Sequence, residues 1–252
     1  YSLGVLAGDG YLDYNDKRMT WQIGLGAVDK DFVDEFARVL LNFFKIQPTF
    51  RLGKKRNYRW KKQYVVKLCS KEACKYINSI GNFKQENWKI PPIIKSLDNS
   101  IKTSFLKGFF DSEGEIDKKI GRIGATSMNL IGLKEIGELL SGLGIRYTII
   151  SVRDKRPNTH QKYRLRIQDR KSIEIFNNNI RFTIKRKQEI LDNCVYAYKF
   201  TKILPEELED RKKQILDLRN KKLTYQQISE KLNLNLTTVW NVCKRHHISK
   251  RS

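Results

Sequence analysis

The sequence is poor in the residues that build disulfide frameworks and zinc sites. Its 252 residues include four cysteines and three histidines, and these show neither Cys-x-x-Cys pairing nor histidine partners at zinc spacing. This pattern argues against a disulfide-stapled secreted domain and against a zinc finger. We expect reduced, mostly buried thiols in an intracellular protein of the cytoplasm, the nucleoid or an organelle matrix.

Long apolar runs and acidic residues are also scarce. No stretch of about 20 apolar residues could span a bilayer, and no secretory signal opens the chain, so no membrane partner is expected. Lys and Arg number 50 against 27 Asp and Glu, a formal net charge of +23, which indicates a polyanionic partner. The basic residues alternate with aromatic ones and form no basic amphipathic helix, which favours nucleic acid over a membrane surface.

One short motif is present twice. Residues 3–10 read Leu-Gly-Val-Leu-Ala-Gly-Asp-Gly, and residues 106–114 read Leu-Lys-Gly-Phe-Phe-Asp-Ser-Glu-Gly. Read as helices, each copy places two small residues one turn apart on one face, so two such helices could touch backbone to backbone. These residues are Gly4 and Gly8 in the first copy and Gly108 and Ser112 in the second.

Each copy ends with an acid followed by a glycine, and the acids Asp9 and Glu113 lie 104 residues apart. We expect left-handed helix stops at Gly10 and Gly114. The acids would then lie close together at the negative ends of helix dipoles, where a carboxylate is disfavoured by about 0.3–1 kcal/mol before repulsion is counted. Such a pair needs a cation, and hard oxygen ligands favour Mg²⁺ or a similar divalent ion. Either copy alone would be interpreted as an ordinary apolar helix; the repetition favours a site.

The two copies resemble the paired motifs of the LAGLIDADG homing endonuclease family, single-chain two-repeat type, over about residues 1–200. The resemblance implies an α+β fold of two pseudo-symmetric αββαββα repeats, here residues 1–96 and 97–202, with the motif helices at their interface. A covalent pair of repeats argues for a monomer. Because the chain lacks an initiator methionine and starts inside its first motif helix, we expect further residues upstream.

The resemblance also implies a metal site. The final acids, Asp9 and Glu113, would bind two or three Mg²⁺ ions shared between the repeats, together with the preceding Gly8 and Ser112. The first copy departs from the pattern, because it has Ala7 where the second has Asp111. We therefore expect Asp111 to act in local structure only.

Two segments resemble the family's catalytic lysine segments. Lys89 precedes the pair Ile90-Pro91, and Lys185 lies ahead of a closing helix, with Lys187 as a close rival. A lysine near the metals could hold a water or stabilise charge in the transition state. The alternatives are a solvated loop cation for Lys89 and a plain phosphate contact for Lys185.

Alternating polar and apolar residues predict strands whose polar face contacts DNA. Residues 18–25 form one such stretch, and residues 58–68 form another with basic and amide side chains suited to bases and phosphates. Residues 163–168 repeat the pattern of residues 58–63 at an offset of 105, which indicates a duplication. A solvated strand face is the alternative. The candidate contacts are Arg18, Thr20, Gln22, Arg59, Lys61, Gln63, Lys67, Arg164, Arg166 and Gln168.

Helices are expected between these strands. Asp29 and Asp31 are well placed for the start of the helix that follows the first strand stretch. A further unit is expected at residues 203–252, where Thr224 to Gln227 predicts a capping box and the spacing resembles a helix-turn-helix. A small helical cap on the main domain is the alternative. The residues expected to face a DNA groove are Thr237, Thr238, Asn241, Lys244 and Arg245.

These features favour a site-specific double-strand DNA endonuclease that hydrolyses phosphodiester bonds with Mg²⁺. By resemblance, its target site would be long and its role would be intron or intein mobility. Two alternatives stay open. One is a non-catalytic transcription regulator that joins a LAGLIDADG-like domain to a helix-turn-helix, and the other is a splicing maturase that binds intron RNA.

Overall fold

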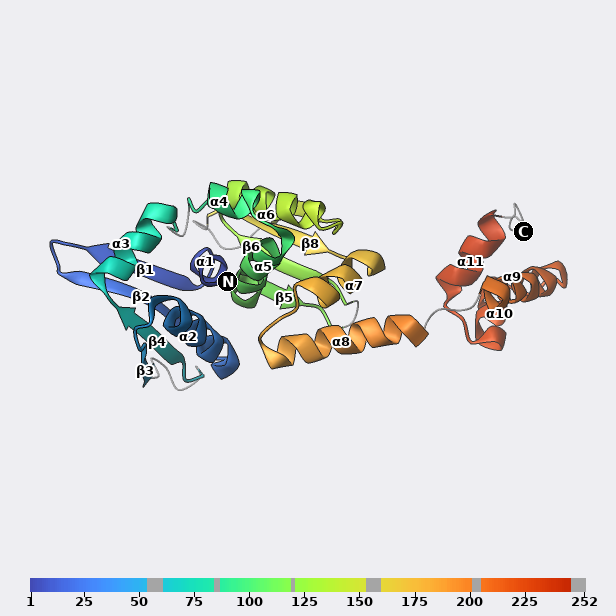
Figure 1. Ribbon diagram of the computed structural model, residues 1–252. Coiled ribbons are helices and arrows are strands. Elements are labelled where there is room, and N and C mark those ends of the chain that lie inside the picture. Colours follow the sequence, from blue (N-terminus) through green and yellow to red (C-terminus); the bar gives the residue numbers. More distant parts are fainter. Residues whose placement is uncertain (54–60, 84–86, 119–120, 153–159, 201–204, 246–252) are drawn as a thin grey trace. The chain divides into compact units, whose positions relative to one another are not determined.

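The computed structural model describes residues 1–53, 61–83, 87–118, 121–152, 160–200 and 205–245. It divides the chain into two compact units, Tyr1–Ala197 and Tyr198–Ser252. The larger unit contains two four-stranded antiparallel sheets with helices, and the described part of the smaller unit is helical (Figure 1). The repeat boundaries at residues 96 and 202 stay a prediction.

The first half of the larger unit follows the order αββαββα. Its sheet has the strand order β1-β2-β4-β3, in which every neighbouring pair is antiparallel. Alternate residues of the two central strands, among them Ile23 and Val66, are fully buried beneath α2 and α3. The elements are α1 (Ser2–Leu6), β1 (Gly10–Asn15), β2 (Thr20–Ala27), α2 (Lys30–Phe44), β3 (Thr49–Leu52), β4 (Tyr64–Cys69) and α3 (Lys71–Ile80).

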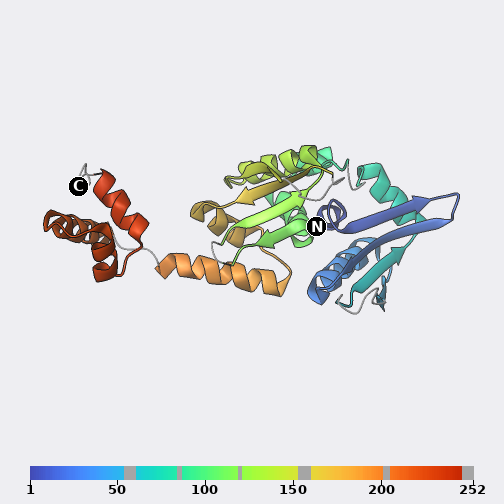
Figure 2. The same cartoon turned by 180° about the vertical axis from the view of Figure 1, so that it is seen from behind.

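The second half repeats this order after the short helix α4 (Pro92–Ser96), and the closing helix α8 (Lys185–Phe200) follows it. Its sheet has the order β5-β6-β8-β7, the same topology as the first. The predicted pair of αββαββα repeats is therefore confirmed (Figures 1 and 2). The elements are α5 (Asn99–Glu113), β5 (Gly114–Ile116), β6 (Ile123–Ser127), α6 (Leu130–Gly142), β7 (Thr148–Val152), β8 (Lys162–Ile167) and α7 (Arg170–Asn179).

Strand register corrects the alignment of the repeats. Thr49 pairs with Lys67 between β3 and β4, and Thr148 pairs with Arg166 between β7 and β8, so equivalent residues of these strands lie 99 apart. The predicted offset of 105 is therefore wrong. Residues 61–63 precede β4 and form no strand, so the predicted strand over residues 58–68 begins too early. Residues 61–63 and 166–168, which the repeated letters would align, are therefore not equivalent positions, and residues 58–60 lie outside the described residues.

Backbone contact between α1 and α5 joins the two halves. A Cβ atom on Gly4 would lie 2.0 Å from the carbonyl oxygen of Phe105, and one on Gly108 would lie 2.1 Å from that of Tyr1. Neither oxygen can rotate away, because both belong to the main chain. The predicted backbone-to-backbone contact is confirmed, and in both views the two helices lie side by side between the sheets.

The glycines that close the motifs serve a different purpose from the one expected. Neither Gly10 nor Gly114 has a positive φ, so the predicted left-handed stops are wrong. Each is the last residue of its motif and the first residue of a strand. A Cβ on Gly114 would lie 2.1 Å from the carbonyl oxygen of Phe110, and one on Gly10 would lie 2.9 Å from that of Val5. Glycine is needed here because the strand starts tightly against the last helical turn.

The smaller unit consists of α9 (Pro205–Asn220), α10 (Tyr225–Leu232) and α11 (Leu236–Arg245). The predicted capping box is confirmed, because the side chains of Thr224 and Gln227 each accept a hydrogen bond from the other's backbone N–H. Its core is small and consists of Ile215, Ile228, Val239 and Cys243. In the described ranges of the chain, every helix is too short or too polar to cross a membrane.

The helix contact predicts opposite effects for two glycine substitutions. Gly108→Ala should lower the free energy of unfolding by about 1–3 kcal/mol, because α1 and α5 must separate to admit the methyl group. Gly142→Ala is the matched control, since no atom lies within 4 Å of its added Cβ. Because Gly142 is the last residue of α6, the substitution should raise stability by at most about 0.5 kcal/mol, the lower end of the mid-helix value. Urea denaturation measures both. Equal effects would contradict the contact.

Candidate functional site

The contact of α1 with α5 brings two acids together. Glu113 is the last residue of α5, and Asp9 lies in the turn after α1. A Cβ on Gly8 would lie 2.4 Å from that of Ser112 and 3.2 Å from Cγ of Glu113, which shows how closely the two motif ends approach. The sequence predicted this proximity.

Both carboxyl groups are disfavoured as anions. Burial, followed by repulsion from Asp9, raises the pKa of Glu113 from 4.5 to about 7. Asp9 remains accessible to solvent, yet protein atoms surround enough of its carboxylate for partial desolvation to raise its pKa as well. Two adjacent carboxyl groups with raised pKa values form a place where a cation would be stabilised.

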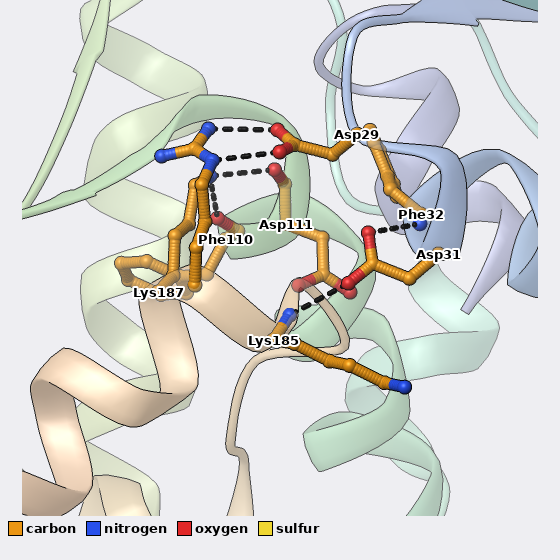
Figure 3. A network of polar contacts seen from close by, with 8 residues as sticks. Asp29, Asp31, Phe32, Phe110, Asp111, Lys185 and Lys187 are labelled. Atoms are coloured by element: carbon orange, nitrogen blue, oxygen red, sulfur yellow. Dashed lines mark hydrogen bonds and ion pairs between the residues drawn. The ribbon is translucent and has the colours of Figure 1, made fainter.

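Lys187 provides a buried positive charge beside this pair. Its side chain is 7% exposed, and its Nζ donates a hydrogen bond of 2.8 Å to the backbone carbonyl of Asp111 (Figure 3). The Lys187 charge lowers the pKa of both Asp9 and Glu113, although burial outweighs this effect. Burial also lowers the pKa of Lys187 itself. The predicted rival of Lys185 is thus the lysine that the fold places near the acids.

Lys185 has a different environment. Its backbone N–H donates a 2.7 Å hydrogen bond to Asp31, while its side chain is exposed and points away from Asp111 in Figure 3. Arg186 makes two hydrogen bonds to the carboxylate of Asp29, at 2.6 and 2.7 Å, and this guanidinium holds the pKa of Asp29 below its usual range. Asp29 lies at the N-cap of α2 but makes no capping hydrogen bond there. The two acids expected to start α2 therefore also fix the start of α8.

Asp111 ties the same region together from within. It is 1% exposed, and its carboxylate accepts hydrogen bonds of 2.8 Å from the Tyr1 hydroxyl and from the Thr183 backbone N–H. Burial raises its pKa. The carboxylate fixes the segment that leads into α8, and its own carbonyl receives Lys187. Its equivalent in the first motif, Ala7, has no side chain that could make such bonds.

Lys89 lies between two buried neighbours, Trp88 and Ile90, and is itself exposed. The backbone on either side is held in place, because the side chain of Asn129 donates to the Trp88 carbonyl at 2.6 Å and the Ile90 N–H donates to Glu135 at 2.7 Å. Trp88, not Lys89, lines a recess beside the acids. The recess is bounded by Ala7, Gly8, Trp88, Glu113, Met128 and Lys162, among others.

The acid pair has the donor set that a hard divalent ion takes. Among the described residues, no group of three His, Cys, Asp or Glu side chains could hold a metal, so protein carboxylates would supply two ligands. This fits Mg²⁺, which is commonly bound through one or two carboxylates with water and substrate phosphates completing its shell. The Ser112 hydroxyl donates to the Gly108 carbonyl at 3.1 Å, and Gly8 contributes backbone only.

The predicted DNA contacts of the first half gather in part on one sheet face. Lys67 of β4 donates a 2.6 Å hydrogen bond to Gln22 of β2, which joins two of the predicted residues. Thr20 begins β2, and Arg18 lies exposed in the hairpin before it. Lys61 and Gln63 lie exposed ahead of β4, and Arg59 lies outside the described residues.

The contacts of the second half occupy β8 and the residue that follows it. Arg164 donates one hydrogen bond of 3.1 Å to Thr126 and makes an ion pair of 3.2 Å with Glu115. Arg166, the equivalent of Lys67, has a buried Nε with no hydrogen-bond partner in the described part of the chain. Leu165, between the two arginines, and Ile167, directly after Arg166, are fully buried. The two arginines therefore lie on the sheet face opposite the core. Gln168 is exposed just after the strand.

The predicted groove-facing residues of the smaller unit all lie on α11. Thr237, Thr238, Asn241 and Lys244 are exposed, while Val239 and Cys243 are fully buried on the opposite side. Arg245 is the last residue of the helix. The exposed face of the helix is thus polar and basic apart from Leu236 and Trp240.

Two αββαββα repeats that meet at paired helices, with one acid at the end of each, define the class of this fold and site. The sequence profile of the LAGLIDADG-like domain matches residues 3–81 and 100–181, which is more than half of the chain. The chain belongs to the family of LAGLIDADG-like domain proteins.

Three relatives come from Methanocaldococcus jannaschii. The chain is 28% identical over 192 residues to a glutamine–fructose-6-phosphate aminotransferase, a match that covers 75% of this chain and 17% of that protein. An uncharacterised protein is 30% identical over 207 residues, with coverage of 77% and 70%. A probable translation initiation factor IF-2 is 32% identical over 117 residues, with coverage of 44% and 10%. The chain thus spans only a minor part of the two named relatives.

Solved structures share the fold at low sequence identity. I-DmoI in complex with DNA and Ca superposes with a TM-score of 0.55 at 20% identity, and covers 77% of this chain and 95% of that chain. Full-length DUF199/WhiA from Thermatoga maritima has a TM-score of 0.50 at 18% identity, with coverage of 97% and 90%. The first is a homing endonuclease by its description.

The raised pKa of Glu113 predicts how stability depends on pH. The group binds a proton more tightly in the folded chain than in the unfolded chain, so the folded state loses stability as pH rises from about 4.5 to about 7. Glu113→Gln removes this titration. The variant should therefore gain stability over the wild type above pH 7 and lose that advantage near pH 4.5, in urea denaturation without divalent ions. A pH-independent difference would contradict the assignment.

The position of Lys187 predicts a second titration effect. Lys187→Met removes a charge that lowers the pKa of Glu113, so that pKa should rise above its wild-type value of about 7. Lys185→Met is the matched control, and it should leave the pKa in place because Asp9 and Lys187, not Lys185, are the charges that act on Glu113. Carbon-13 NMR of labelled glutamate carboxyl groups measures both. If Lys185→Met gave the larger shift, Lys187 would lose its place in the site.

Proposed function

We propose that this chain is a site-specific double-strand DNA endonuclease that hydrolyses phosphodiester bonds with a divalent metal ion. The observation that carries the proposal is the pair formed by Asp9 and Glu113 at the interface of the two motif helices. Without a bound cation, a carboxyl pair with raised pKa values destabilises the folded state, because mutual repulsion and desolvation both oppose ionisation. Cation binding would offset this cost.

Each part of the site has a role in this proposal. Asp9 and Glu113 hold the metal, and the neighbouring Gly8 lets the two motif ends approach. A divalent ion would supply Lewis-acid stabilisation of charge on the scissile phosphate. Lys187 adds a positive charge beside it, in the role predicted for Lys185, and Lys89 stays a candidate for the other side of the pair.

The sheets would bind the DNA duplex. Lys67 and Gln22 in the first half and Arg164 and Arg166 in the second lie on sheet faces opposite the core, where they would contact phosphates and base edges. The net charge of +23 supports a polyanionic partner. I-DmoI, which shares the fold, has been crystallised in complex with DNA and with Ca or Mn.

The pattern of relatives supports a role in gene mobility. An aminotransferase and a translation initiation factor have unrelated activities, yet the chain is similar to 17% of the first and 10% of the second. A segment that recurs inside unrelated proteins is what a mobile insert would leave. We therefore propose homing as the biological role, with the chain acting as a monomer because its two halves are already joined.

A non-catalytic DNA-binding regulator is the second candidate. The likeness to full-length WhiA extends over 97% of this chain and so includes most of the smaller helical unit, whereas the likeness to I-DmoI covers 77%. This difference favours a function that uses the smaller unit. The smaller helical unit is the part that such a regulator would use to bind DNA. In that case Asp9 and Glu113 would have no function in metal binding.

Incubation with a randomised duplex library separates the two candidates. Defined cut ends are expected in Mg²⁺ and not in Ca²⁺, and sequencing of the ends would give the target site.

Asp9→Asn should abolish cutting and retain binding in Ca²⁺, because it removes a metal ligand and leaves the DNA contacts. Glu189→Gln is the control, since Glu189 is an exposed acid on α8, and it should cut normally. Selected sequences without cut ends in either ion would favour the regulator.

A further inference from the structure

An apolar recess lies between the N-terminal ends of α10 and α11 in the smaller unit. It is lined by Thr224, Tyr225, Gln226, Leu236, Thr237 and Trp240. Leu236 and Trp240 lie one helical turn apart, and they remain 48% and 42% exposed. Two large apolar side chains exposed side by side in a concave surface indicate a contact site.

The recess belongs to the outward face of α11. Val239 and Cys243 are fully buried on the inward side, so Trp240 shares its face with Thr237 and Asn241. The ammonium of Lys244 lies 4.6 Å from the centre of the Trp240 ring, a distance suited to a cation–π interaction. An apolar contact and a cation are therefore held next to each other on one helix face.

The charge of this part of the chain favours nucleic acid as the occupant. Glu230 is the single acid from residue 221 to the end, and a segment with seven Lys and Arg against one acid favours a polyanion. The basic residues are Lys221, Lys222, Lys231, Lys244, Arg245, Lys250 and Arg251.

The major groove of DNA offers one apolar group on its base edges, the 5-methyl group of thymine. When a helix-turn-helix binds DNA, the N-terminal part of its second helix contacts base edges. Leu236 and Trp240 occupy that part of α11. We propose that this recess receives the methyl group of one thymine in the target site, and that Trp240 is a specificity-determining residue. The proposal rests on DNA binding by the chain, as proposed above.

Replacement of thymine by deoxyuridine tests the contact, because it removes the methyl group and leaves base pairing and backbone intact. The full chain would first select its site from a randomised duplex library in Ca²⁺, where no cutting is expected. Each thymine of the selected site is then replaced in turn. At one thymine, loss of the methyl group should weaken binding by the wild type about fourfold, the value of one buried methyl group.

Trp240→Ala should bind the thymine and deoxyuridine duplexes with equal affinity at that position. Tyr76→Ala is the matched control, an exposed aromatic residue of the larger unit, and it should keep the fourfold preference. Lys244→Ala should weaken both duplexes equally, because a phosphate contact does not depend on the methyl group.

Two outcomes would overturn the inference while the proposed function stands. The wild type could tolerate deoxyuridine at every thymine of a well-defined site, or Trp240→Ala could keep the preference. Failure of the wild type to select any duplex would instead refute DNA binding, and the inference would fall with it. A contact of the recess with deoxyribose belongs to the first outcome, because the sugar is unchanged by the replacement.

Discussion

The structure depends on the absence of side-chain atoms where α1 crosses α5. At Gly4 and Gly108 the two backbones approach so closely that a methyl group would overlap a carbonyl oxygen of the other helix. This approach, continued at Gly8, brings Asp9 and Glu113 together and raises the pKa of both. Attraction between the halves is thus achieved by packing, and the electrostatic consequence is a pair of acids that only a cation or protons can relieve. Close packing of the helix backbones at Gly4 and Gly108 therefore determines the electrostatics of Asp9 and Glu113.

Most of the fold could be predicted from the sequence, because local patterns of residues mark its helices and strands. Two motifs at a fixed offset, alternating strands and a capping box at Thr224 each report local geometry that tertiary contacts did not change. Strand β3 was not foreseen. Its four residues are all exposed, so pairing with β4, and not the burial of one face, makes them a strand. The offset of 105 failed because it aligns residues 61–63, which precede β4, with residues 166–168, two of which lie in β8. Register is set by hydrogen bonds between strands, and a sequence does not display those.

Part of the candidate site could also be predicted from local sequence patterns. Proximity of Asp9 and Glu113 followed from the small residues that flank them. The choice between Lys185 and Lys187 did not, because it depends on where α8 begins and which of its faces turns inward. Asp29 and Asp31 decide this by binding Arg186 and the Lys185 N–H, and both contacts join residues more than 150 positions apart. No local pattern reports such a pairing.

Those contacts also limit how the two repeats can evolve. Asp29 and Asp31 belong to the first repeat, yet the helix whose start they hold follows the second. The two repeats share a fold, but one cannot be exchanged without affecting contacts made by the other. A recombination event that replaced one repeat with that of a relative would separate the acids from Arg186 and release the segment that carries Lys187. Compatible exchange would have to preserve this cross-repeat joint, so these residues should change together over evolutionary time.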